Sequence, residues 1–433
     1  MTSLNQATSF PTIHWQEGGV ECSARWRSER GAAAPKKVML ADDTMSADTA
    51  YRLACEGTAL LWRGDFQNAR QMLQALGRRI DQSASTDKRG RRPRQTGFKD
   101  VRHSPEEAAA AAAKGFHVHR QAQAQRARVL GMVLLSFEGD YALALRRSPD
   151  ARVACAQAWG VAAEGEGASV ASMRELLGLI SAFEWRKNGV EIAALGEAPH
   201  NRIHPYYGVY SPLRGEYVDL VATAPLAKNP AALTAFDIGT GTGVLAAVLV
   251  RRGIGHVVAT DMDERALACA AANFEQLEVS ASVDLQKANL FPEGLADIIV
   301  CNPPWLPARA SSPIEHAVYD EGSAMLLGFL NGLVAHLTPK GEGWLILSNL
   351  AEQLGLRTRE ELLAAFASAG LRVKAHMDVK PVHAKAMDAT DPLHAARSAE
   401  ITSLPFIWPH RLGQTWSSIM TPPTPACSKA RTM

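Results

Sequence analysis

The sequence predicts an α/β protein whose carboxyl-terminal half is a doubly wound sheet of seven strands, preceded by a mostly helical amino-terminal region. Three observations support this fold. From about Asn201, short apolar runs alternate with segments of helical periodicity, which is typical of parallel strands joined by helices. A glycine-rich turn follows the first of these runs, and an asparagine with two prolines ends the fourth. With 433 residues, the chain has room for two domains.

The amino-terminal part is expected to contain an arm and a substrate-recognition region. Residues 1–47 lack periodicity and are rich in Ser, Thr, Gly and Ala, which favours a mobile arm. Residues 48–200 form the substrate-recognition region. Within it, residues 50–79 carry apolar side chains at helical spacing with a break at Gly64, which predicts a helical hairpin.

A further helix is predicted to begin at Ser104. This residue has the N-cap type, Pro105 suits the first helical position, and Glu107 completes a capping box. The helix carries three arginines, Arg120, Arg126 and Arg128.

A basic run precedes that helix. Its charged residues are Lys88, Arg89, Arg91, Arg92, Arg94 and Lys99. The run is either a solvated loop or an arm that contacts phosphates, and the arginines of the following helix favour the second interpretation.

The carboxyl-terminal domain is expected over residues 201–410, followed by a flexible tail at 411–433 that is rich in Pro, Ser and Thr. Its strands are expected at 233–238, 256–261, 282–287, 296–301, 343–349, 371–377 and 400–407. Helices are expected at 243–252, 263–275, 321–337 and 357–369. No helix separates the last two strands, so they should pair antiparallel.

The turn after the first strand has the residues of a ligand-binding turn. Gly239, Gly241 and Gly243 alternate with other residues, Thr240 lies between the first two, and Asp237 precedes them. Positive φ angles and close approach of a backbone to a ligand both favour glycine. The helix that starts at Gly243 can receive a polar or anionic group at its amino terminus.

Asp261 ends the second strand, where an acid can accept hydrogen bonds from both hydroxyls of a ribose. The alternative is a glycine-rich turn with an N-capping aspartate and no ligand. The glycine spacing is G-x-G-x-G rather than the commoner dinucleotide pattern G-x-G-x-x-G. Residues 206–408 thereby resemble class I S-adenosylmethionine-dependent methyltransferases, which implies a Rossmann-like methyltransferase sheet and S-adenosyl-L-methionine as cofactor.

The resemblance also implies further cofactor contacts. The segment before the first strand is similar to the one that closes over the cofactor, which places Tyr210, Ser211 and Pro212 near the methionine end. Asn289 follows the third strand, where the family often has an acid near the adenine, so this chain departs from the pattern there.

Asn302 ends the fourth strand, in the sequence "IIVCNPPW". In a sheet of order 3-2-1-4-5, the first and fourth strands are neighbours, and their carboxyl ends flank the ligand crevice. Asn302 should therefore lie beside the glycine turn and border the cofactor. The preceding Cys301 is interpreted as a small core residue.

The residues after this strand suit methyl transfer to nitrogen. The lone pair of an aromatic amine or carboxamide is delocalised, and acceptors on its N–H bonds favour a pyramidal, nucleophilic nitrogen. The Asn302 side-chain oxygen and the Pro303 carbonyl would be those acceptors. Pro303 and Pro304 restrict the backbone, and Trp305 offers a face for stacking. The motif is similar to the [DNS]-P-P-[FYW] motif of amino-methyltransferases; the alternative is a proline-rich strand end with an aromatic plug.

Three functions remain open. The first is methylation of an exocyclic base amine in rRNA, tRNA or DNA. The second is methylation of a glutamine in a release factor or ribosomal protein. The third is a nucleoside- or RNA-binding module without catalysis, which the intact motif residues disfavour. A dehydrogenase is a weaker competitor, because hydride transfer does not require the Asn-Pro-Pro-Trp end.

Composition limits the remaining classes. A net charge of +2 does not fit a nucleic-acid-coating polycation, and no apolar run is long enough to span a membrane. The six cysteines form no CxxC pair, and no Cys/His spacing indicates a metal site. We expect a cytoplasmic protein with free thiols.

Overall fold

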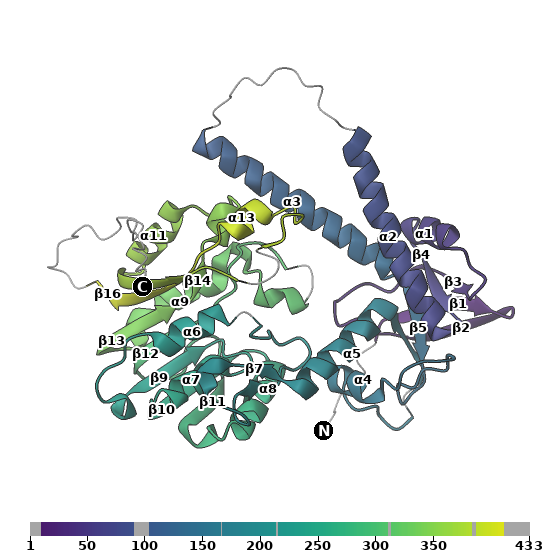
Figure 1. Ribbon diagram of the computed structural model, residues 1–433. Helices are drawn as coiled ribbons and strands as arrows, with labels where there is room; N and C mark the ends of the chain where they lie inside the picture. The colour runs from purple at the N-terminus through teal and green to yellow at the C-terminus, as the bar shows by residue number, and fades with distance from the viewer. Residues whose placement is uncertain are drawn as a thin grey trace, which may run out of the picture.

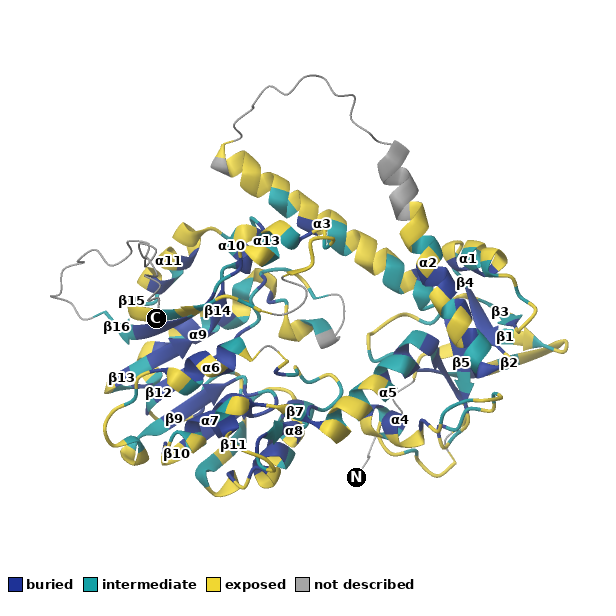
Figure 2. Ribbon diagram, in the orientation of Figure 1, coloured by how far each residue is buried: buried dark blue, intermediate teal, exposed yellow. Residues whose placement is uncertain are grey.

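The computed structural model describes residues 10–90, 104–165, 167–213, 215–310, 313–382 and 387–410. Within these residues the chain forms two α/β units side by side, each built on its own sheet (Figure 1). The central strands of both sheets are buried, whereas the surrounding helices are exposed on their outer faces (Figure 2).

The amino-terminal unit contains a six-stranded mixed sheet in the order β1-β2-β6-β5-β4-β3. Its strands are β1 (Thr12–Glu17), β2 (Val20–Trp26), β3 (Lys37–Ala41), β4 (Thr58–Trp62), β5 (Val133–Phe137) and β6 (Ser169–Ser172). Its helices are α1 (Ala47–Cys55), α2 (Phe66–Gly90), α3 (Pro105–Leu130), α4 (Arg152–Trp159) and α5 (Met173–Asn188).

This unit differs from the sequence-based expectation in two places. Residues 12–41 of the expected arm form β1, β2 and β3 of the sheet. The expected hairpin at residues 50–79 contains β4 between its two helices, because the apolar Thr58–Trp62 run pairs with β3 and β5. More residues of this unit lie in helices than in strands, as expected. The helices nevertheless accompany a six-stranded sheet that the sequence did not predict.

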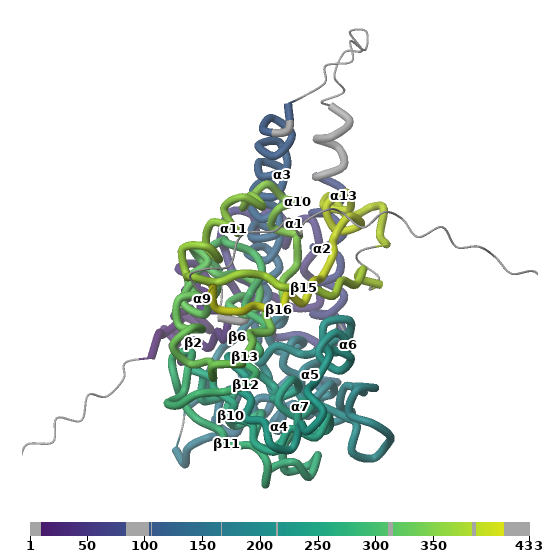
Figure 3. The backbone as a smooth tube through the Cα atoms, turned by 90° about the vertical axis from the view of Figure 1, so that its left-hand side faces the viewer, coloured from purple at the N-terminus to yellow at the C-terminus, as the bar shows by residue number. Residues whose placement is uncertain are grey.

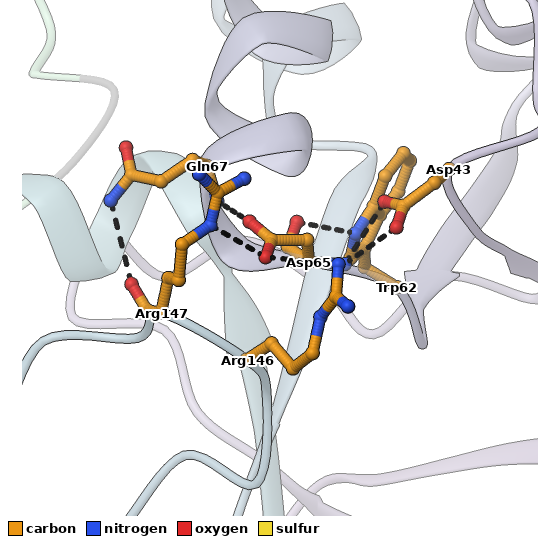
Figure 4. A network of polar contacts seen from close by, with 6 residues as sticks. All are labelled: Asp43, Trp62, Asp65, Gln67, Arg146 and Arg147. Carbon is orange, nitrogen blue, oxygen red and sulfur yellow. Dashed lines mark hydrogen bonds and ion pairs between the residues drawn. The ribbon is translucent and has the colours of Figure 1, made fainter.

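A buried carboxylate, Asp65, connects the ends of the strands in this sheet (Figure 4). Its backbone N–H donates to Asp43, which follows β3, at 2.9 Å. Its carboxylate accepts from the Arg147 Nε at 2.8 Å and lies 3.5 Å from Arg146, both in the loop after β5. The hydrogen bond from Arg147 lowers the pKa of Asp65 below its ordinary value. The network therefore links the loops that follow β3, β4 and β5.

Helix α3 joins the two units. It begins at the predicted capping box of Ser104 and Glu107 and lies beside α2 (Figures 1 and 3). Its Phe116 side chain is 2% exposed and packs among apolar side chains of the carboxyl-terminal unit. The Ala109 carbonyl approaches Gly355 so closely that a Cβ on that glycine would lie 2.2 Å from the oxygen. α3 is therefore packed against both units.

The carboxyl-terminal unit contains an eight-stranded sheet with the path β11-β10-β9-β12-β13-β16-β14, and β15 pairs with β16. Its strands are β9 (Thr234–Ile238), β10 (His256–Asp261), β11 (Val283–Lys287), β12 (Ala296–Cys301), β13 (Leu337–Leu345), β14 (Leu347–Ser348), β15 (Leu371–Val379) and β16 (Thr402–Pro409). The expected fifth strand, at residues 343–349, is divided between β13 and β14. The order 3-2-1-4-5 and the antiparallel pairing of the last two strands are confirmed.

Helices cover both faces of this sheet, as a doubly wound fold requires. One core contains side chains of α6 (Glu216–Thr223), α7 (Val244–Arg251) and α8 (Glu264–Gln276). The opposite core contains side chains of α9 (Ala324–His336) and α11 (Arg359–Ser368). The short α10 (Leu350–Gln353) and α13 (His394–Ser398) lie near α3 (Figure 2), and β7 (Val190–Glu191) pairs with β8 (Arg202–Ile203). Four of these helices, α7, α8, α9 and α11, match the predicted ones, whereas α6, α10 and α13 were not predicted.

A polar connection between the units involves Arg265, in the first turn of α8. Its guanidinium donates to the Glu29 carboxylate from two nitrogens, each at 3.2 Å. It also donates to the carbonyls of Tyr207 and Ala158, each at 3.3 Å. Glu29 follows β2, so this contact fixes the end of an amino-terminal strand against the carboxyl-terminal sheet.

Candidate active site

A cavity of about 1570 Å³ lies between the two units. The carboxyl-terminal unit contributes the glycine turn, Asp261 and residues 302–306 to its lining. The amino-terminal unit contributes α3, the segment after β2 and the start of α5. The predicted glycine turn, acid and Asn-Pro-Pro-Trp end, which are far apart in the sequence, therefore meet in one cavity.

The glycine turn connects β9 to α7 as predicted. Gly239, Gly241 and Gly243 have φ angles of +72°, +55° and +82°, which disfavour side chains. A Cβ on Gly243 would lie 2.5 Å from the Phe274 ring of α8, so this glycine permits close helix packing. A Cβ on Gly241 would meet no atom within 4 Å, and this residue lines the cavity. The space beside the Gly241 backbone is thus open to a ligand.

Asp261 has the placement expected of a ribose-binding acid. It ends β10, which pairs with β9, and it lines the cavity. Its two oxygens accept backbone N–H groups of Gly241 and Asp263, each at 3.0 Å. A carboxylate oxygen has more than one lone pair, so both oxygens can also accept a hydroxyl. The open backbone at Gly241 and this fixed carboxylate together fit a nucleoside.

Asp237 and Thr240 hold the glycine turn together, and of the two only Thr240 lines the cavity. Asp237 is 1% exposed and is not part of the cavity lining. One of its oxygens accepts the Thr240 hydroxyl at 2.7 Å and the Ala246 N–H at 3.0 Å. Burial raises the pKa of Asp237 to about 6, although both hydrogen bonds lower it. The Thr240 hydroxyl bonds to Asp237, and its backbone N–H donates to the Thr260 carbonyl at 2.8 Å, so Thr240 shapes the cavity wall without a free donor.

We expect Asp237→Asn to change the dependence of stability on pH. The native protein holds a proton on Asp237 up to about pH 6, whereas an unfolded aspartate loses it near pH 4. The native state therefore binds more protons between these values, and its free energy of unfolding falls as pH rises through them. The shift corresponds to about 3 kcal/mol. An asparagine oxygen can keep both hydrogen bonds without the charge.

Urea denaturation of both proteins between pH 4 and pH 7 measures this effect. The variant should gain stability relative to the wild type as pH rises. A stability difference that stays constant over this range would contradict the raised pKa of Asp237.

Asn302 lies at the carboxyl end of β12, beside the end of β9, where Cys301 is in register with Ile238. It lines the same cavity as the glycine turn, together with Pro303 and Pro304. Burial raises the pKa of the Cys301 thiol well above its ordinary value. This thiol therefore stays protonated, which agrees with its interpretation as a core residue.

Trp305 has a contact that the sequence did not predict. Its indole Nε1–H donates to the Asn302 Oδ1 at 3.0 Å, while its ring packs at the edge of the main core. An amide oxygen has two lone pairs, so Asn302 can still accept an N–H from a substrate. Trp305 therefore orients Asn302, in addition to any stacking.

Trp305→Phe should lower kcat although an aromatic ring remains. Loss of one hydrogen bond that orients Asn302 corresponds to about 2- to 13-fold. Trp185→Phe is the matched control, because Trp185 lies on α5 with 48% of its surface exposed. Single-turnover methyl transfer, with a parallel cofactor titration, measures the effect. If Trp305→Phe had a normal kcat and a raised KM, the role of Trp305 would be stacking on the substrate and not orientation of Asn302.

Helix α3 holds the segment that follows Trp305. Arg120 of α3 forms an ion pair with Glu315 at 3.3 Å and lies over the Tyr319 ring at 4.2 Å. Leu306 and Tyr319 form a bridge within that segment. Arg126 forms an ion pair with Asp81 of α2 and bonds the Gly77 carbonyl. These arginines therefore have partners within the protein, and their roles depend on contacts that no local pattern reveals.

The other expected site residues lie in different places. Tyr210 lines the cavity, whereas Ser211 and Pro212 do not. Asn289 is exposed and is not part of the lining either. The basic run at residues 88–99 falls outside the described side chains. The expected tail at 411–433 also lies outside the described residues.

Within the described part of the chain, no helix is long and apolar enough to cross a membrane. The same residues contain no group of three or more His, Cys, Asp or Glu side chains able to hold a metal ion. The five described cysteines are free.

The glycine turn and the strand end of Asn302 both lie in the segment that matches a known family. Residues 223–332 match the family described as ribosomal protein L11 methyltransferase (PrmA). The chain is 45% identical over 71 residues to a ribosomal protein L11 methyltransferase of Pelotomaculum thermopropionicum, covering 16% of this chain and 23% of the relative. It is 33% identical over 123 residues to a release factor glutamine methyltransferase of Cereibacter sphaeroides, covering 25% and 44%. The chain thus spans less than half of the length of either relative.

A solved structure of ribosomal protein L11 methylase from Lactobacillus delbrueckii subsp. bulgaricus aligns with 45% of this chain and 77% of its own, at 19% identity and a TM-score of 0.32. The assignment of the fold rests on the strand order of this chain itself. The matched segment carries the glycine turn, Asp261 and Asn302, and the carboxyl-terminal unit has a Rossmann-like methyltransferase fold. This unit is therefore similar to the class I methyltransferases, whose cofactor is S-adenosylmethionine.

Proposed function

We propose that the protein methylates a nitrogen in a protein side chain, such as the carboxamide of glutamine. The observation that carries this proposal is the position of Asn302, which shares one cavity with the glycine turn and Asp261. An amide oxygen beside a nucleoside-binding turn suits an N–H substrate. The printed names of the relatives are those of enzymes acting on a ribosomal protein and a release factor, which supports a protein substrate.

Base methylation in nucleic acid was the first interpretation of the sequence, and it now has less support. Of the three arginines expected to favour phosphate contacts, Arg120 and Arg126 form ion pairs with Glu315 and Asp81. Arg128, the third, bonds the neutral Gln125 side chain. The protein-substrate alternative is therefore the stronger one.

The residues of the chain have separate tasks in this reaction. S-adenosylmethionine supplies an electrophilic methyl group on a sulfonium. Asp261 and the open backbone at Gly241 would hold the ribose and the adjoining part of the cofactor. Asn302 Oδ1 would accept one N–H of the substrate nitrogen, and the Pro303 carbonyl would accept the other. Holding both bonds fixed favours a pyramidal nitrogen and positions its lone pair.

One experiment decides between the substrate classes. The protein is incubated with methyl-labelled cofactor and with separate pools of ribosomal proteins, release factors, rRNA, tRNA and DNA, with Asn302→Ala as the control. We expect label in a protein pool. Label in a nucleic acid would overturn the proposal in favour of base methylation. Cofactor binding without label in any pool would favour a module without catalysis.

A further inference from the structure

Two arginines in the wall of the cavity have side chains that form no hydrogen bond or ion pair with another described residue. Arg30 follows β2, and Arg174 lies in the first turn of α5, just after its N-cap Ser172. Both line the cavity that contains Asn302. Within the described part of the chain, neither guanidinium forms a hydrogen bond or an ion pair, in contrast to Arg120 and Arg265 in the same region.

The carboxylates beside these arginines are engaged elsewhere. Glu29 accepts two nitrogens of Arg265. Glu175 is 3% exposed and accepts the backbone N–H of Glu29 at 2.6 Å. Glu175 attracts Arg30 through space, but no carboxylate among the described residues forms an ion pair with Arg30 or Arg174. The corner of the cavity formed by Arg30 and Arg174, which we call the arginine corner, therefore keeps guanidinium donors available for an anion.

The two guanidiniums also act on each other. Burial lowers the pKa of Arg174 below its ordinary value, and the positive charges of Arg30 and Arg126 lower it further. Arg126 forms an ion pair with Asp81, whereas Arg30 and Arg174 repel each other. Arg30 is exposed, but Arg174 is partly buried, and a partly buried charge without a hydrogen-bond partner is costly to a fold. An anion bound at the corner would offset that cost with charge-assisted hydrogen bonds.

We propose that the arginine corner binds a carboxylate of the protein substrate. This inference rests on the proposed function. The active site would then recognise two features at once: a nitrogen at Asn302, and an acidic side chain or chain terminus at Arg30 and Arg174. The pair would determine which substrate segments enter the cavity, whereas Asn302 would act in the reaction itself.

The remaining lining of the cavity favours a protein over a nucleic acid. A nucleic acid places a phosphate on every nucleotide, so it needs a continuous basic path. The cavity instead combines the arginine corner with several acidic residues, namely Asp261, Asp263, Glu315, Asp388 and Asp391. Arg120 and Arg397 also line the cavity, but they form ion pairs with Glu315 and Asp391. A polypeptide with one acidic group near its methylated residue suits this mixed lining better than a chain of phosphates does.

Direct binding tests the corner without requiring turnover. The probe is fluorescently labelled dodecaglutamate, and a labelled dodecauridylate RNA serves as the nucleic-acid arm. Both are titrated by anisotropy against the full chain saturated with S-adenosylhomocysteine. The variants are Arg30→Gln, Arg174→Gln and the double variant. Arg70→Gln is the matched control, because Arg70 is an exposed residue of α2 outside the cavity.

We expect the double variant to bind dodecaglutamate about tenfold more weakly or worse, which is the scale of losing hydrogen bonds to a charged group. Arg70→Gln should bind as the wild type does. Unchanged binding in the double variant would overturn the inference. So would a loss confined to the RNA probe, which would assign the corner to phosphate.

Calorimetry with S-adenosylhomocysteine separates this inference from the proposed function. If the double variant loses cofactor affinity instead of dodecaglutamate affinity, the corner serves the cofactor and the inference is wrong. If the pool experiment labels a nucleic acid, the proposed function fails, whatever the arginine variants show. Thermal denaturation of each variant confirms that it is folded before binding is compared.

Discussion

Replacing Asn302 with alanine should lower kcat by about 100-fold or more, which is the usual effect of losing one preorganised transition-state hydrogen bond. The acceptor matters most when the substrate nitrogen becomes pyramidal, so the loss should fall on the chemical step. Cofactor affinity should change little, because the glycine turn and Asp261 provide the nucleoside contacts. Single-turnover transfer to the labelled protein fraction, with a cofactor titration alongside, measures both.

Asn229→Ala is the matched control for this experiment, because Asn229 is exposed, precedes β9 and lies outside the cavity lining. Its kcat should equal that of the wild type. If Asn302→Ala transfers methyl at the wild-type rate, the asparagine is only a strand end and the mechanism is wrong. If it loses cofactor binding and thermal stability together, Asn302 holds the loop rather than the substrate.

Asp261→Ala should weaken binding of S-adenosylmethionine by about 10- to 150-fold, the range for losing hydrogen bonds to a charged acceptor. The structure adds a second reason for the loss, since Asp261 also fixes the N–H groups of Gly241 and Asp263. Without that carboxylate, the turn would be less well ordered for the ligand. Isothermal titration calorimetry with S-adenosylmethionine measures the affinity.

Asp284→Ala provides the control, because Asp284 is an exposed acid on β11 outside the cavity lining. It should bind the cofactor as the wild type does. Normal cofactor affinity in Asp261→Ala would show that the ribose is held by other groups. Tight binding of NAD by the wild type, without binding of S-adenosylmethionine, would falsify the family-based choice of cofactor.

The carboxyl-terminal half could be predicted from sequence because its signals are local. Each strand is a short apolar run, and the rule that carboxyl ends of neighbouring parallel strands meet brings Asp261, Gly241 and Asn302 together. The capping box at Ser104 is equally local, and the structure contains it. Asn289 shows the limit of a family analogy, because its exposed side chain does not reach the cavity lining.

The amino-terminal sheet could not be predicted in the same way. β4 is five residues long and lies between two helices, so its apolar side chains match a helical period as well as a strand. Its identity depends on pairing with β3 and β5, and the latter is separated from it by α2 and α3. The bond from Trp305 to Asn302 and the placement of Arg30 and Arg174 likewise depend on tertiary contacts.

The position of β16 has a consequence for synthesis of the protein on the ribosome. β16 pairs with β13 on one side and with β15 on the other, antiparallel to both. Both partners leave the ribosome before it, so the nascent sheet has an open edge at β13 until β16 emerges. Unpaired strand edges promote aggregation. A nascent chain stalled before Thr402 would therefore expose an aggregation-prone edge, although its glycine turn and Asn302 had already been made.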